Sequence, residues 1–222
     1  MRWRVAAAVT AGVFALSCAQ HANSSSSKPF PHVAHVVVLG DSVGHGAGDE
    51  TRRGISGNLG AVNLALNGAR TYDVRRVIRA RAARIAIASA DAVILSIGGN
   101  DLFGDPLSRT ESTIWPSVMM SRTIARIDRI VSDIRGLNPS ARVYLIGLYN
   151  PYRDSSLRDF LDRQVALWDS RLVAHFAGQP NVDVVRIADL FAYVPRLSGI
   201  DHFHPDGEAY RLIAQRIAMT WR

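Results

Sequence analysis

Four short segments of the chain carry residue types that together suit acyl transfer. They are Gly40-Asp41-Ser42-Val43-Gly44, Asn67-Gly68, Gly98-Gly99-Asn100-Asp101 and Asp201-His202-Phe203-His204-Pro205. A serine hydroxyl is a weak nucleophile at neutral pH and needs an adjacent base. Ser42 is the candidate nucleophile and His204 is the candidate base. Asp201 lies three residues before His204, close enough within one turn to orient the imidazole and stabilise its charged form.

Three hydrogen-bond donors are available for the oxyanion that forms when a serine attacks an ester carbonyl. They are the backbone N–H of Ser42, the backbone N–H of Gly68 and the side-chain amide of Asn100. A glycine at position 68 lets the backbone approach a substrate without a Cβ atom in between. Removing one such donor typically lowers the rate on the order of 10²–10³-fold. Leu102 and Phe103 directly follow Asn100, so we expect them to contact the substrate, although both also fit an apolar core.

Several of these residues also have a structural interpretation. Serine is favoured at helix N-caps, and Ser42 stands where a strand is expected to turn into a helix. Asn100 fits a cap in the same way. His202 is an alternative base, but it directly follows Asp201 and is less well placed to donate a ring N–H to that carboxylate. The sequence favours the catalytic interpretation because all four segments occur together.

Alternating strands and helices must position these segments. Apolar runs predict strands at 36–39, 92–97, 142–148 and 182–187, and a weaker strand at 61–66. Helical periodicity predicts helices at 73–88, 114–136 and 155–177, and a last helix capped by Asp206 and reaching 219. This alternation predicts an α/β fold, a three-layer α/β/α sandwich with a mainly parallel sheet of five strands. Ligands of such sheets bind beyond the carboxyl ends of the strands, so the four segments should meet at one edge.

In this order, the four segments resemble the sequence blocks of the SGNH hydrolase family, also called GDSL esterases and lipases. Gly40-Asp41-Ser42-Val43 resembles the first block, with valine where the family name has leucine. The resemblance to the other three blocks rests on Gly68, on Gly98-Gly99-Asn100-Asp101 and on the Asp201-x-x-His204 spacing. The resemblance covers residues 33–220 and implies a flavodoxin-like sheet. It implies that Ser42 is the nucleophile, His204 the base, Asp201 its orienting acid, and Gly68 and Asn100 oxyanion donors, with no metal or organic cofactor.

The composition is that of an ordinary globular protein. The chain has 222 residues, of which 48% are hydrophobic and 20% charged. Its single cysteine excludes an intramolecular disulfide and a zinc site built on clustered thiolates. No apolar run reaches the roughly 18 residues that would span a bilayer. No linker divides the chain after residue 33, so we expect one hydrolase domain over residues 32–222, acting as a monomer.

Residues 1–20 have the pattern of an export signal. Arg2 and Arg4 form a positive n-region, and an apolar stretch of signal-peptide length follows. Ala15-Leu16-Ser17-Cys18 resembles a lipoprotein box, which would place lipid on Cys18, whereas Ser17-Cys18-Ala19 fits ordinary signal peptidase. The sequence leaves both open. Residues 21–31, with four consecutive serines, predict a flexible linker. We therefore expect an exported protein, either secreted or attached to the cell envelope.

The formal net charge of +7 comes almost entirely from arginine, because Lys28 is the only lysine. Six of the arginines gather on and beside one predicted helix: Arg70, Arg75, Arg76, Arg79, Arg81 and Arg84. The favoured interpretation of this cluster is a solvated helix face, and the alternative is attraction to an anionic envelope surface. We expect no nucleic-acid partner for an exported chain.

Other functions fit the sequence less well. A phosphate-binding loop needs a Gly-Lys pair, but Lys28 lies upstream of the glycine-rich segment. In a larger α/β-hydrolase an earlier strand and loop supply part of the oxyanion hole, and Ser42 follows the first strand. A non-catalytic module would lack a catalytic group, and none is missing. The sequence predicts a serine esterase or lipase acting on short-chain acyl or acetyl esters of lipids or sugars. An acyltransferase using the same triad on an envelope lipid or glycan is the alternative.

Overall fold

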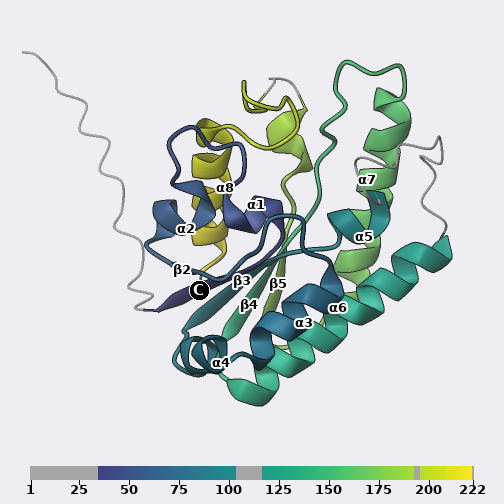
Figure 1. The fold of residues 1–222 in the computed structure, drawn as a ribbon. Helices are drawn as coiled ribbons and strands as arrows, with labels where there is room; N and C mark the ends of the chain where they lie inside the picture. Colours follow the sequence, from purple (N-terminus) through teal and green to yellow (C-terminus); the bar gives the residue numbers. More distant parts are fainter. Residues whose placement is uncertain (1–34, 104–116, 193–195, 222) are drawn as a thin grey trace, which may run out of the picture.

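The computed structural model of the protein describes residues 35–103, 117–192 and 196–221 (Figure 1). The predicted signal and linker, 1–20 and 21–31, lie outside the described residues, and Cys18 lies with them. The first three residues of the helix predicted at 114–136 also fall outside them.

Five parallel strands form the sheet at the centre of the molecule. They are β1 (Val36–Gly40), β2 (Val62–Asn63), β3 (Ala92–Ser96), β4 (Arg142–Ile146) and β5 (Val182–Val185), in the spatial order β2-β1-β3-β4-β5. Every residue of β1 and β3 is buried, as expected for strands covered on both faces. The predicted α/β fold with a five-stranded parallel sheet is confirmed.

Alternate side chains of β1, β3, β4 and β5 enter two separate apolar cores. Val37 and Leu39 of β1 pack into the first core, whereas Val36 and Val38 pack into the second. The first core is covered by α3 (Thr71–Arg79), α4 (Arg81–Ala88), α6 (Ser117–Leu137) and α7 (Arg158–Phe176). The second core is covered by α2 (Gly54–Leu59) and α8 (Gly207–Thr220). Helices therefore lie on both faces of the sheet, which completes the predicted three-layer sandwich (Figure 1).

The helix predicted at 73–88 is two helices, α3 and α4, separated at Ala80. The backbone of Ala80 is extended, with ψ of 139°. Ile78 of α3 and Ile87 of α4 are both buried in the first core, although they are nine positions apart. At about 100° per residue, one continuous helix would point these two side chains about 180° apart. The break at Ala80 allows both short helices to turn apolar side chains inward.

Other boundaries differ by a few residues. The predicted strand at 61–66 has only two residues in β2, but the N–H groups of Leu64 and Leu66 continue the ladder to the carbonyls of Val38 and Gly40 at 2.8 and 2.9 Å. Asp206 caps α8 as predicted, accepting from Ala209 N at 2.7 Å. The short helix α1 (Ser42–His45) begins at the residue where the sequence predicts a strand-to-helix turn. Three other short helical segments were not predicted: α2, α5 (Gly99–Phe103) and η1 (Ala188–Phe191). Among the described residues no helix has both the length and the apolarity to cross a membrane.

Candidate active site

The segments predicted to carry chemistry follow the carboxyl ends of neighbouring strands. Asp41-Ser42 follows β1, Gly68 lies in the connection from β2 to α3, and Asn100 lies in α5 directly after β3. Because β2, β1 and β3 are parallel neighbours, these connections leave the sheet at the same edge. The segment 201–206 precedes α8 and approaches this edge from a loop.

Ser42 is the first residue of α1, and its hydroxyl is not used as a helix cap. The N-cap is Asp41, whose side chain accepts from the N–H of Val43 at 3.1 Å. The carbonyl of Ser42 accepts from the N–H groups of Gly46 and Ala47 and so fixes the end of the turn. Among the described residues no hydrogen bond occupies the Ser42 hydroxyl. The capping interpretation of this serine is therefore unnecessary, and its hydroxyl is left for another role.

Asp41 ties the turn that carries Ser42 to Ser96 on the neighbouring strand β3. Only 5% of its surface is exposed, and its carboxylate accepts from the hydroxyl of Ser96 at 3.0 Å. The backbone N–H of Asp41 donates to the carbonyl of Ser96 at 2.8 Å. Burial raises the pKa of Asp41 to about 7, although the hydrogen bonds from Ser96 and Val43 oppose this shift. These contacts give Asp41 a structural role in the turn that carries Ser42.

Asp201 and His204 form the aspartate–histidine pair that the sequence predicts. Nδ1 of His204 lies 2.7 Å from Oδ2 of Asp201. The other carboxylate oxygen accepts from the backbone N–H groups of Phe203 and His204, both at 2.9 Å. The three-residue spacing therefore lets one carboxylate shape the turn and hold the ring. Partial burial opposes the shift, but the hydrogen bonds from His204 and Phe203 hold the pKa of Asp201 below its ordinary value.

His202, the alternative base, occupies a different position. Its side chain is exposed and its backbone has φ of 54°, in the left-handed region. Its N–H donates to the carbonyl of Ser198 at 2.9 Å. Within the described part of the chain, the Asp201 carboxylate bonds the His204 ring and not the His202 ring. The geometry of this turn favours His204 over its neighbour.

The histidine segment packs against the loop that follows Ser42. A Cβ atom on Gly48, which has φ of +79°, would lie 2.7 Å from the Cβ atom of His204. The same loop is tied to α8, because the hydroxyl of Tyr210 donates to the carbonyl of Ala47 at 2.7 Å. No hydrogen bond between Ser42 and His204 is formed among the described residues. Catalytic hydrogen bonds are often long in structures without substrate and tighten when substrate binds.

Gly68 and Asn100, the predicted oxyanion donors, belong to two connected loops. Gly68 has φ of +73°, and a Cβ atom there would meet nothing within 4 Å, so backbone conformation rather than crowding favours glycine. The side-chain nitrogen of Asn100 donates to the carbonyl of Ala69 at 2.9 Å. This bond uses one of its two N–H groups and leaves the other for a substrate. Asp101 adds a second link, since its carboxylate accepts from the N–H and hydroxyl of Thr71 at 3.0 and 2.7 Å.

Leu102 and Phe103, the predicted substrate contacts, lie in α5. Leu102 is 6% exposed and packs in the first core. The side chain of Phe103 lies outside the part of the chain that the structure describes. A role of these two residues in substrate binding stays a prediction.

Tyr149 supports the histidine segment, a role that the sequence does not reveal. Its hydroxyl donates to the backbone carbonyl of Phe203 at 2.8 Å, and its ring stacks on Phe191 with a centroid distance of 4.2 Å. Nearby, the ring of Tyr152 meets the edge of the Phe203 ring, which in turn meets His204 at 5.1 Å. We call residues 149–152, which follow β4, the rim. The hydroxyl contact joins residues 54 positions apart and has no local signal.

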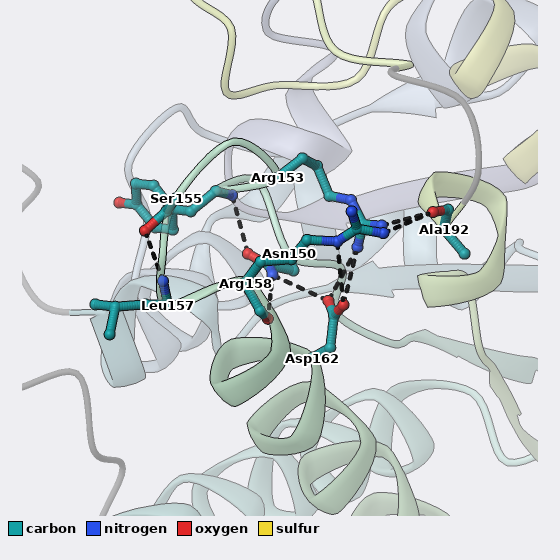
Figure 2. Close-up of polar contacts among 8 residues, drawn as sticks. Asn150, Arg153, Ser155, Leu157, Arg158, Asp162 and Ala192 are labelled. Carbon is teal, nitrogen blue, oxygen red and sulfur yellow. Dashed lines mark hydrogen bonds and ion pairs between the residues drawn. The ribbon is translucent and has the colours of Figure 1, made fainter.

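A polar cluster holds this rim in place, as Figure 2 shows. The side chain of Asn150 donates to the carbonyl of Arg158 at 3.1 Å and to Asp162 at 2.9 Å. Arg153 contacts the same carboxylate at 3.0 Å and donates to the carbonyl of Ala192 at 2.5 Å. The loop after β4 is thus tied both to α7 and to the end of η1. These ties hold the segment that carries Tyr149 and Tyr152.

Within 35–103, 117–192 and 196–221, no group of three or more histidine, cysteine, aspartate or glutamate side chains is arranged to hold a metal ion. The arrangement of Ser42, His204, Asp201 and Asn100 suits nucleophilic acyl transfer by the chain's own groups.

Comparison with known proteins assigns the family. Residues 38–212 match the model of the GDSL-like lipase/acylhydrolase family. YpmR, an uncharacterized protein of Bacillus subtilis (strain 168), is 28% identical over 226 residues, which cover 90% of this chain and 89% of that protein. The lipase Lip_vut3 from a goat rumen metagenome is similar in fold, with a TM-score of 0.68, 18% identity and coverage of 83% of this chain and 96% of that one. Phospholipase A1 from Streptomyces albidoflavus NA297 has a TM-score of 0.60, 19% identity and coverage of 83% and 97%. The chain therefore belongs to the GDSL-like lipase/acylhydrolase family and is a carboxylic ester hydrolase.

Proposed function

We propose that the protein is an exported serine esterase in which Ser42 is the nucleophile, His204 the base and Asp201 its orienting acid. The observation that supports this most strongly is the 2.7 Å contact between His204 Nδ1 and Asp201, on a segment packed against the loop after Ser42. With its proton held toward the carboxylate at Nδ1, the ring has Nε2 as its basic nitrogen. The unused hydroxyl of Ser42 is the group that this nitrogen would deprotonate.

The proposed reaction begins when Ser42 Oγ bonds to the carbonyl carbon of the ester and its proton passes to His204 Nε2. The carbonyl π bond opens, and its electron pair moves to oxygen. When the intermediate collapses, the ester C–O bond breaks and the alcohol leaves with the proton from His204. Water then attacks the acyl-enzyme with the same groups, which releases the acid and restores Ser42. Asp201 stabilises the imidazolium in both halves and stays ionised.

The oxyanion would be stabilised by the N–H groups of Ser42 and Gly68 and by the free N–H of Asn100. The contact of Asn100 with the carbonyl of Ala69, at 2.9 Å, supports this assignment because it couples the two loops that carry the donors. A donor held in place before the reaction needs no reorganisation when charge develops on oxygen. The proposed chemistry thus draws only on groups of the chain.

The proposed substrates are accessible esters, namely short-chain acyl or acetyl esters of lipids or sugars. Short length supports this preference, because about 190 residues in the predicted domain 32–222 leave little room for a large lid over the site. Export is proposed from the positive n-region and apolar stretch within residues 1–20. Mass spectrometry of the mature N-terminal peptide tests export and decides whether Cys18 carries lipid.

The test of the proposed function is hydrolysis of a series of p-nitrophenyl esters by the purified protein. Ser42→Ala should lower kcat by roughly 10⁴-fold or more, whereas Ser170→Ala, an exposed serine on α7, should leave it unchanged. His204→Asn should be as severe as Ser42→Ala. His202→Asn is its matched control, because asparagine tolerates the left-handed backbone at 202. Full activity of Ser42→Ala, or equal losses at 202 and 204, would overturn the assignment.

The acyltransferase alternative uses the same acyl-enzyme and differs only in the acceptor. Adding a sugar or glycerol to the esterase reaction therefore separates the two. Release of free acid at an unchanged rate supports hydrolysis. Accumulation of the acylated acceptor at the expense of free acid supports transfer.

A further inference from the structure

The positive charge of the molecule is concentrated in three adjacent helices. Together α3, α4 and α6 contain nine arginines and three aspartates, a net charge of +6, whereas the whole chain carries +7. The arginines are Arg75, Arg76, Arg79, Arg81, Arg84, Arg122, Arg126, Arg129 and Arg135. By contrast, α7 contains three arginines and three aspartates. We call the outer surface of α3, α4 and α6 the basic face.

The three helices lie side by side on one face of the sheet (Figure 1). Arg75 of α3 binds Asp133 of α6 at 2.7 Å, which ties these two helices together. Both bury their apolar residues in the first core, for example Val74 and Ile127. Their opposite sides therefore point outward as one surface.

Arginines recur on these outer sides at the spacing of a helix face. Arg76 and Arg79 of α3 are exposed and share their face with Tyr72. On α6, exposed arginines occur at 122, 126 and 129, again four and three residues apart. The repeated spacing places the guanidinium groups in two parallel rows.

Several of these guanidinium groups lack a carboxylate partner. Arg79, Arg84 and Arg129 are exposed, and none of them forms an ion pair with an acid in the described part of the chain. Arg76 approaches Asp73 only at 3.8 Å, and its side chain is 76% exposed. The charge of the face is therefore not neutralised internally and is available to an anionic partner.

The basic face lies next to the candidate active site at the N-terminal end of α3. Thr71, the first residue of α3, binds Asp101, which directly follows Asn100. The next residue, Tyr72, is 66% exposed, and Leu66, in the connection that leads to Gly68, is 42% exposed. A tyrosine has an apolar ring and a polar tip, which suit it to a lipid–water interface. Apolar side chains thus stand where the charged surface reaches the catalytic edge.

We propose that the basic face docks the protein on an anionic lipid surface, with Tyr72 and Leu66 entering the interface beside the active site. Complementarity of charge supplies the attraction, because clustered arginines bind lipid headgroups of negative charge. The apolar side chains favour a lipid layer over a dissolved polyanion, which offers no apolar phase to receive them. This docking does not depend on the chemistry of Ser42. It goes beyond the proposed esterase function by naming the surface at which the enzyme works.

The test measures partitioning of the purified full-length protein onto vesicles. One set contains phosphatidylcholine alone, and the other contains equal parts of phosphatidylcholine and phosphatidylglycerol. The protein should bind the anionic vesicles and not the neutral ones, and added salt should weaken binding. The N-terminal segment is the same in every variant below, so differences between variants report on the face.

Two triple variants remove the same charge from different places. Arg79→Gln, Arg84→Gln and Arg129→Gln together neutralise part of the basic face. Arg52→Gln, Arg186→Gln and Arg211→Gln remove three charges from outside α3, α4 and α6. Each arginine near an anionic surface strengthens partitioning about fivefold, so the first triple variant should bind on the order of 100-fold more weakly. The second should stay within a few-fold of the native protein, and both should hydrolyse soluble p-nitrophenyl esters normally.

A third variant tests whether the partner is a lipid surface, without changing the charge of the protein. Tyr72→Ser should weaken binding to anionic vesicles and leave binding to double-stranded DNA unchanged. Equal losses in the two triple variants, or equal binding to neutral and anionic vesicles, would overturn the proposal. DNA binding as tight as vesicle binding, together with no effect of Tyr72→Ser on vesicles, would assign the face to a dissolved polyanion instead.

Discussion

The two halves of the candidate site are held in different ways. On the serine side, Asp41 and Ser42 are 5% and 8% exposed and follow directly from a central strand. On the histidine side, Asp201 is exposed and lies in a loop between η1 and α8. The serine turn is fixed by strand geometry and by Ser96 on the neighbouring strand. The histidine turn depends on its own aspartate and on a tyrosine hydroxyl from the loop after β4.

Because the two halves are held differently, changes to their supporting residues should affect different properties, either the stability of the fold or the rate of catalysis. A buried strand-to-helix turn is part of the core, so changes there that spare the hydroxyl should act mainly on folding. A loop held by a few contacts can shift without unfolding the protein, and a small shift of a catalytic group lowers the rate. We therefore expect supporting residues of the serine side to govern stability and those of the histidine side to govern kcat.

The largest effect on the histidine side is expected for Asp201→Asn. Asparagine can still accept the N–H groups of Phe203 and His204, so the turn is preserved while the charge beside the ring is lost. We expect kcat on a soluble ester to fall by about 10⁴-fold with little change in the melting temperature. The loss should persist through neutral and mildly acidic pH, because the pKa of Asp201 lies below its ordinary value and its carboxylate stays ionised there. Asp159→Asn, an exposed aspartate on α7, is the control.

On the serine side, the predicted oxyanion donor gives the next largest effect. Asn100→Ala removes the side-chain amide and its bond to the carbonyl of Ala69. We expect kcat to fall on the order of 10²–10³-fold, with KM for a p-nitrophenyl ester nearly unchanged. An effect on KM alone would contradict the oxyanion role and place Asn100 in ground-state binding.

A matched pair of tyrosines tests the comparison itself. Tyr149 and Tyr210 are both buried, and each donates its hydroxyl to a backbone carbonyl, that of Phe203 at 2.8 Å and that of Ala47 at 2.7 Å. Each Tyr→Phe change should lower the free energy of unfolding by about 1 kcal/mol, as expected for one lost hydrogen bond. Only Tyr149→Phe, on the histidine side, should also lower kcat, by about five- to tenfold. Equal kcat losses for the two variants would show that the halves are not separable.

The smallest effect on activity is expected at Asp41, where stability should depend on pH instead. Burial raises the pKa of Asp41 to about 7, whereas its ordinary value is 3.8. Between these values the folded protein holds a proton that the unfolded chain has lost, so the stabilising effect of that proton fades as pH rises through this window. Asp41→Asn should therefore gain stability relative to the native protein as pH rises from acid to neutral. Denaturation at several pH values measures the difference.

Asp49 supplies the opposite control for that experiment. Burial opposes the shift, but hydrogen bonds from Gly54, Thr51 and Arg53 hold the pKa of Asp49 below its ordinary value. Its stabilisation is present above the ordinary pKa and is lost as pH falls through the folded value. Asp49→Asn should thus be less stable than the native protein at neutral pH, and this deficit should shrink in acid. The same sign for both variants would contradict the electrostatic account of the serine turn.

The sequence predicts the central strands well because β1 and β3 are buried on both faces. Continuous apolar runs such as 92–97 have no periodicity to misread, and their order with intervening helices implies parallel pairing. The break at Ala80 has no such signal, since neither glycine nor proline marks it. It arises from the positions of Ile78 and Ile87 in the first core, which only the packed structure reveals.

The same distinction applies to the site. The contact between Asp201 and His204 could be predicted because both residues lie in one turn. Which of two adjacent residues caps α1 could not be predicted, because aspartate and serine are both favoured there and burial against Ser96 decides for Asp41. The hydroxyl of Tyr149 reaches Phe203 only after β4 and the histidine loop have folded together. The sequence predicts the contact within one turn, but it does not predict the contacts that distant segments make with the site.

The central claim is that His204 and Asp201 activate Ser42. It is tested most directly by reaction with an alkyl fluorophosphonate, which modifies activated serines, followed by mass spectrometry of the resulting peptides. The account predicts a single adduct on Ser42, formed rapidly in the native protein and at least about 10³-fold more slowly in His204→Asn and Asp201→Asn. An adduct on another serine, or modification of Ser42 at the native rate in His204→Asn, would contradict it.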